Sequence, residues 1–103
     1  MVVIIDYGMG NLFSVANALK FLKADAKISG RASDLKNADR IILPGVGAFP
    51  DGMKNLQNLG LIRALEEEVL KNKKPFLGIC LGMQLLAGEG EENGLTKGLG
   101  WIS

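Results

Sequence analysis

The sequence has no histidine and a single cysteine, Cys80, among its 103 residues. Because histidine is absent, the chain carries no imidazole that could activate a nucleophile near neutral pH. A lone cysteine excludes an internal disulfide and fits a reducing cytoplasm. The chain therefore offers one thiol and no conventional base to accompany it.

A charge excess and a long apolar run are also missing. The 12 Lys and Arg residues against 11 Asp and Glu give a net charge of +1, which provides no basic surface for nucleic acid or an anionic membrane. The N-terminal run Val2–Ile5 has no basic lead and is stopped by Asp6, so it is too short for a signal peptide or a membrane span. We expect a soluble, cytoplasmic protein with neither nucleic acid nor a membrane as partner.

The composition is that of a globular chain, with 48% apolar and 22% charged residues. The length allows one domain, residues 1–103, but is short for a complete α/β enzyme. No internal repeat or linker divides the sequence.

Strand and helix patterns alternate along the chain. Short apolar runs predict buried strands at residues 2–5, 41–43 and 76–80, and residues 26–29 could form a further short strand. Helical spacing of apolar residues follows over 12–22, from about Gly52 to Gly60, over 61–69 and over 81–86, and Ser33-Asp34 opens a brief helical turn. This alternation predicts a doubly wound, flavodoxin-like α/β fold, with a mainly parallel sheet and helices on both faces.

The helix after Gly60 carries acidic residues at 66–68 and lysines at 71, 73 and 74. This order of charges suits the helix dipole. We expect these side chains to form a solvated face.

Three glycine-bearing turns follow the predicted strands, at Asp6–Asn11, Pro44–Gly47 and Gly78–Gly82. Ligands of parallel sheets gather beyond the carboxyl ends of the strands. We therefore expect the functional site at the edge where these turns meet.

The turn Gly78-Ile79-Cys80-Leu81-Gly82 has the spacing of a nucleophile elbow, with cysteine in place of serine. A sharp strand-to-helix reversal strains the central residue and leaves no room for side chains two places to either side. The thiol would then lie at a helix N-terminus, which favours thiolate, and the Leu81 N–H could hold an oxyanion. The alternative is an ordinary turn around a cysteine that is buried as packing.

The other two turns are less specific on their own. Pro44–Gly47 could supply a second oxyanion donor, or it could be a plain turn. The first turn invites a dinucleotide interpretation, but Phe13 stands where the third glycine would be. We expect no cofactor, and we expect the methionines to serve packing rather than a metal site.

Taken in order, "IDYGMGN", "ILPGVGAF" and "GICLGMQLL" closely resemble the motifs of cysteine-triad (class I) glutamine amidotransferases. Within that family the resemblance is greatest to the glutaminase subunits of imidazole glycerol phosphate synthases, from histidine biosynthesis. It covers nearly the whole chain. A related group that supplies ammonia for surface-sugar amidation shares the closing "GLGWI" equally well, so that alternative stays open.

The resemblance implies a role for each turn. Cys80 would attack the side-chain amide of glutamine to form a glutamyl thioester and release ammonia. The remaining residues fall into four groups: oxyanion donors Gly45, Val46, Gly47 and Leu81; substrate-binding residues Gly47 and Gln84; elbow glycines Gly78 and Gly82; and a partner-facing turn of Tyr7, Gly8, Met9, Gly10 and Asn11. Ammonia would pass through a channel to the cyclase (synthase) subunit of a heterodimer.

The sequence departs from the family in one respect, because the family's catalytic histidine and glutamate lie beyond the last residue of this chain. We therefore expect the N-terminal part of an amidotransferase domain, with no useful glutaminase turnover alone. An uncovered sheet edge would favour self-association. The competing class is a non-catalytic flavodoxin-like interaction module in which Cys80 only packs.

Overall fold

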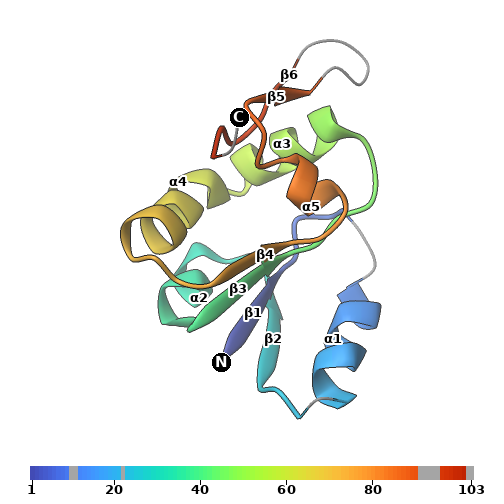
Figure 1. Ribbon diagram of the computed structural model, residues 1–103, viewed down its shortest axis with the longest axis vertical. Helices are drawn as coiled ribbons and strands as arrows, with labels where there is room; N and C mark the ends of the chain where they lie inside the picture. The colour runs from blue at the N-terminus through green and yellow to red at the C-terminus, as the bar shows by residue number, and fades with distance from the viewer. Residues whose placement is uncertain (10–11, 22, 91–95, 102–103) are drawn as a thin grey trace.

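The computed structural model describes residues 1–9, 12–21, 23–90 and 96–101 (Figure 1). Four strands form one parallel sheet in the order β2-β1-β3-β4. Their bounds are β1 Val2–Ile5, β2 Ala26–Ser29, β3 Arg40–Leu43 and β4 Phe76–Gly78. The register places Val3 opposite Ile41, and Ile42 opposite Leu77.

Helices lie on both faces of this sheet, which confirms the predicted fold class. The helix α1 (Leu12–Phe21) lies on one side in Figure 1, and α2 (Ala32–Asn37), α3 (Phe49–Asn58) and α4 (Leu61–Leu65) lie on the other. The main core forms on this second face. It joins strand residues such as Val3, Ile41 and Leu43 to helix residues such as Leu35 and Leu65, all essentially inaccessible to solvent.

The face beside α1 is incompletely covered. An apolar hollow of about 340 Å³ lies there, lined among others by Val2, Leu19, Ile42 and Leu77. Leu77 belongs to β4, one of the two edge strands, and is 54% exposed. The part of the chain that the structure describes therefore leaves one end of the sheet open to solvent on this face.

Several boundaries differ from the sequence prediction. The helix expected from Gly52 begins at Phe49, because Pro50 stands in its first turn, where a fixed φ and a missing N–H are tolerated. The strand expected to reach Cys80 ends at Gly78. The next helix, α5, is a single turn, Leu81–Gln84.

The helix after Gly60 also changes character along its length. It is α-helical over Leu61–Leu65 and a π-helix, η1, over Glu66–Lys71. After α5 the chain forms a small antiparallel pair, β5 (Glu89–Gly90) with β6 (Thr96–Lys97). None of the helices in the described ranges combines the length and apolarity needed to cross a membrane.

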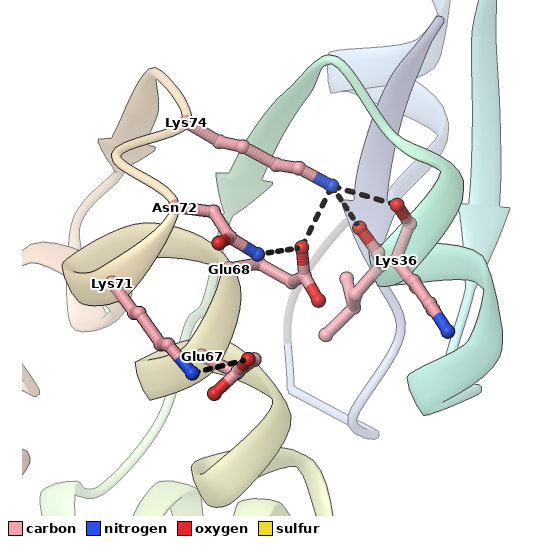
Figure 2. Close-up of polar contacts among 7 residues, drawn as sticks. Lys36, Glu67, Glu68, Lys71, Asn72 and Lys74 are labelled. Carbon is pink, nitrogen blue, oxygen red and sulfur yellow. Dashed lines mark hydrogen bonds and ion pairs between the residues drawn. The ribbon is translucent and has the colours of Figure 1, made fainter.

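The prediction of a solvated face is wrong for Glu68, which lies on η1, and for Lys74, which follows it, as Figure 2 shows. Lys74 Nζ lies 2.9 Å from Glu68 Oε1 and also donates to the carbonyl oxygens of Leu35 and Lys36, at 3.0 and 2.8 Å. Asn72 donates to the same carboxylate oxygen at 3.0 Å. Glu68 is only 6% exposed, and the hydrogen bond from Lys74 holds the pKa of its carboxyl below the ordinary value.

This pair therefore joins η1 to the C-terminal end of α2, where Lys74 adds a donor to the Leu35 carbonyl, which also accepts from the Ala38 N–H, and supplies one to the Lys36 carbonyl. The neighbouring pair Glu67 and Lys71, 3.4 Å apart and largely exposed, is solvated as expected (Figure 2).

Candidate active site

Cys80 lies in the reversal between β4 and α5, with φ 53° and ψ −116°. These angles fall outside the regions that L-residues ordinarily occupy. The residue is exposed. The sequence therefore folds Cys80 into a strained backbone at the carboxyl end of the sheet and leaves it open to solvent.

The two glycines that flank Cys80 are required by close backbone contacts. A Cβ on Gly82 would collide with the Leu43 carbonyl group. A Cβ on Gly78 would lie 2.9 Å from the Gly82 oxygen and equally close to the Met83 backbone. No alanine fits at either position without movement of the main chain, so the elbow geometry expected from the spacing is present.

The helix that follows the elbow is shorter than expected. Hydrogen bonds from the Met83 and Gln84 N–H groups to the Cys80 carbonyl begin α5, which ends after one turn. Few peptide dipoles are aligned in so short a helix, so its macrodipole is weaker than the predicted helix over residues 81–86 would have had.

The oxyanion donor expected at Leu81 is occupied. The Leu81 N–H donates to the Gly45 carbonyl oxygen at 3.1 Å. While this bond is present the N–H group is not available to an oxyanion, so the oxyanion role of Leu81 stays a prediction. The bond does bring the Pro44–Gly47 segment directly against the elbow, as the motif order predicted.

The rest of that segment is more open. Val46 is 68% exposed, and Gly47 has φ 136°, a value that favours glycine. A Cβ on Gly47 would lie 2.5 Å from Met9 Cε. The first and second glycine-bearing turns are therefore in contact, and Met9 packs over Gly47.

Gln84, expected to bind substrate, is exposed and lies one helical turn after Cys80. Its backbone N–H donates to the Cys80 carbonyl oxygen at 3.1 Å. The role of Gln84 in substrate binding stays a prediction.

The first turn divides into buried and exposed parts. Tyr7 is 1% exposed, so its side chain is not available to a partner, which corrects the expectation for this residue. Gly8 is exposed, with φ 81°, and Met9 is half-buried. Gly10 and Asn11 lie outside the described residues.

Two features near the site were not anticipated from the sequence. The Tyr7 hydroxyl donates to the Pro44 carbonyl, and Asn55 Nδ2 donates to the Tyr7 carbonyl at 3.0 Å. A hollow of about 560 Å³ also opens at the carboxyl ends of β1 and β2, bordered among others by Asp6, Arg31 and Asn58. For these two hydrogen bonds the sequence offered one signal, a tyrosine directly before a glycine turn. Nothing in the sequence pointed to Asn55.

Metal ligation has no support in the described ranges, where no group of three or more Asp, Glu, His or Cys side chains is arranged to hold an ion. The chemistry that the arrangement offers is that of the single thiol and the surrounding backbone amides.

Comparison with known proteins places these features in a family. The class-I glutamine amidotransferase family model matches residues 3–95. The chain is 53% identical over 102 residues to imidazole glycerol phosphate synthase subunit HisH 1 of Campylobacter jejuni, which covers 99% of the chain and 51% of that protein. It is 55% identical over 103 residues to subunit HisH of a Geobacillus species, which covers 100% of the chain and 48% of that protein.

A solved crystal structure of a glutamine amidotransferase superposes with a TM-score of 0.79 at 25% identity, over 97% of this chain and 52% of that one. The chain spans about half the length of the curated relatives it matches.

Proposed function

Because this chain belongs to the class-I glutamine amidotransferase family, we propose that it is the N-terminal part of a glutaminase domain with Cys80 as its nucleophile. The observation that carries this proposal is the backbone of Cys80, held at φ 53° between two glycines that cannot accept a Cβ. Strained, exposed nucleophiles of this kind are typical of elbow enzymes. A cysteine used only for packing would be buried.

The reaction that we propose begins with attack of the Cys80 sulfur on the side-chain amide carbon of glutamine. A C–S bond forms, the amide oxygen takes negative charge, and the C–N bond then breaks as the nitrogen accepts a proton and leaves as ammonia. Water hydrolyses the thioester to glutamate and restores the thiol. The chain has no histidine to serve as base and acid for these proton transfers.

The oxyanion of this reaction needs donors from Leu81 and from the Gly45–Gly47 segment. For Leu81 to serve, its N–H must exchange the Gly45 oxygen for the substrate oxygen. We therefore propose that the structure represents a closed state of the oxyanion hole, in which Gly45 occupies the donor. Gln84 and Gly47 would bind the glutamine substrate beside it.

The physiological role that we propose is that of the glutaminase subunit of imidazole glycerol phosphate synthase, in the histidine pathway. The names of the relatives at 53% and 55% identity support this assignment over ammonia supply for surface-sugar amidation. The ammonia would pass to a cyclase subunit in a cytoplasmic heterodimer. Gly8 and Met9 would face that partner, and Gly8 also borders the hollow at Asp6 and Arg31.

The chain alone is expected to release no useful ammonia, since it lacks a histidine and thiol–base units lose most of their activity when one member is missing. Its open sheet face and the free side of β4 are expected to promote self-association.

A chimeric protein tests the function. Residues 1–103 are fused to the second half of the Geobacillus relative, and ammonia release from glutamine is measured with the cyclase subunit of that organism. We expect glutamine-dependent ammonia release from the chimera and at least a 1,000-fold loss, roughly, in Cys80→Ala. Equal activity in Cys80→Ala, or no activity in a cooperatively folded chimera that binds the cyclase, would contradict the proposal.

A further inference from the structure

Tyr7 connects the first turn to the Pro44–Gly47 segment, whose Gly45 carbonyl oxygen accepts the Leu81 N–H. Its ring is buried, with 1% exposure, and its hydroxyl donates to the Pro44 carbonyl oxygen. Burial also raises the pKa of this phenol well above its ordinary value, so the hydroxyl remains a neutral donor. The peptide group that Tyr7 holds is the one directly before Gly45.

Gly45 makes this contact possible. A Cβ at this position would fall on the Tyr7 hydroxyl oxygen and would also lie 3.0 Å from Leu81 Cβ. Glycine is therefore required here for close approach rather than for an unusual φ. The phenol, the Pro44–Gly45 peptide group and Leu81 are packed against one another without space for a further methyl group.

Asn55 holds the main chain of the same tyrosine. Its Nδ2 donates to the Tyr7 carbonyl at 3.0 Å, across 48 positions of sequence. A Cβ on Gly8 would lie 3.3 Å from that nitrogen. The helix α3 thus fixes the main chain of Tyr7, and the Tyr7 side chain fixes the main chain of Pro44.

We propose that Tyr7 is a positioning residue, which orients the Pro44–Gly45 peptide group and thereby keeps the Gly45 carbonyl on the Leu81 N–H. The consequence for catalysis rests on the proposed function, because only there does Leu81 serve as an oxyanion donor. The structural part of the proposal does not depend on glutaminase activity. The Tyr7 hydroxyl controls how often the Leu81 amide is released from the Gly45 carbonyl oxygen.

Hydrogen exchange of the purified chain, resolved by residue with NMR, tests this proposal. Tyr7→Phe removes the hydroxyl and retains the ring. We expect exchange of the Leu81 amide to accelerate about 5- to 10-fold, the factor that corresponds to one lost hydrogen bond. The Asp6 amide, which donates to the Ser29 carbonyl at 2.9 Å, serves as the internal reference and is expected to change by less than about 2-fold.

Ser29→Ala is the matched control, because it removes another buried hydroxyl at the end of a strand. It is expected to leave the ratio of Leu81 to Asp6 exchange rates unchanged or lower. Asn55→Ala provides a second route to the same contact, and we expect it to raise that ratio in the same direction as Tyr7→Phe.

The proposal is overturned if the Leu81 and Asp6 amides accelerate equally in both Tyr7→Phe and Asn55→Ala, since a merely structural role predicts uniform loss of protection. Failure of the proposed function can be distinguished from failure of this positioning role. It would appear as loss of substrate-directed labelling at Cys80 in the unaltered chain, and it would leave the exchange ratios as predicted here.

Discussion

Replacement of Cys80 by glycine is expected to stabilise the chain, although it removes the proposed nucleophile. The backbone at φ 53° and ψ −116° costs an L-residue about 1 to 3 kcal/mol, and glycine adopts it without that strain. Glycine loses about 0.5 to 1 kcal/mol more conformational entropy on folding than alanine. Because Cys80 is exposed, loss of the sulfur removes little packing.

The informative comparison is Cys80→Gly with Cys80→Ala, since both lack sulfur and only alanine retains a Cβ. The terms above leave glycine more stable by about 0 to 2.5 kcal/mol. Urea unfolding followed by far-UV circular dichroism measures this difference in the free energy of unfolding. Near the midpoint of a thermal scan, each 1 kcal/mol corresponds to roughly 4 to 8 °C for a domain of this size.

Ala18→Gly is the control, because Ala18 is an exposed residue inside α1 with an ordinary backbone. There glycine is expected to destabilise by about 1 kcal/mol. If Cys80→Gly is also less stable than Cys80→Ala, the backbone of Cys80 is not strained and the elbow interpretation is refuted.

Three further predictions follow from contacts elsewhere. Gly82→Ala is expected to destabilise the chain by about 3 kcal/mol or more in urea unfolding, because its Cβ would collide with the Leu43 carbonyl; an unchanged midpoint would show that this backbone yields easily. Lys74→Met is expected to lower stability by about 2 to 3 kcal/mol at pH 7, since it leaves the buried Glu68 carboxylate without its main donor. Because the folded pKa of Glu68 lies below 4.5, the stability from this pair is present above pH 4.5 and is lost as the pH falls through the lowered value; Lys74→Met should flatten that acid dependence in urea titrations between pH 6 and 3. Leu77→Lys is expected to reduce self-association in sedimentation velocity, because it places a charge on the open sheet face; a parent chain that stays monomeric across the concentration series would contradict this.

The strands and the elbow were accessible from the sequence because both depend on local pattern. The run Val2–Ile5 is apolar throughout, as strands buried on both faces require. The spacing of Gly78 and Gly82 around Cys80 reports a steric demand that few other folds impose. The motif order then placed the Pro44–Gly47 turn beside the elbow.

The polar contacts were not accessible in the same way, because they join residues far apart in sequence. Lys74 reaches a helix end 38 and 39 positions away, and charge pattern alone indicated only solvent exposure. The occupied Leu81 amide depends on the orientation of a peptide group that carries no side chain at Gly45. A motif identifies which amides lie near a site, but it does not show which acceptor they hold.

The rate at which 6-diazo-5-oxo-L-norleucine labels the chain tests directly whether Cys80 is a nucleophile placed to meet glutamine. The reagent is a glutamine analogue that alkylates thiols, and mass spectrometry locates the adduct. We expect stoichiometric labelling at Cys80, faster than labelling of free cysteine under the same conditions and slowed by added glutamine. Labelling at the rate of free cysteine, with no protection by glutamine, would contradict this expectation.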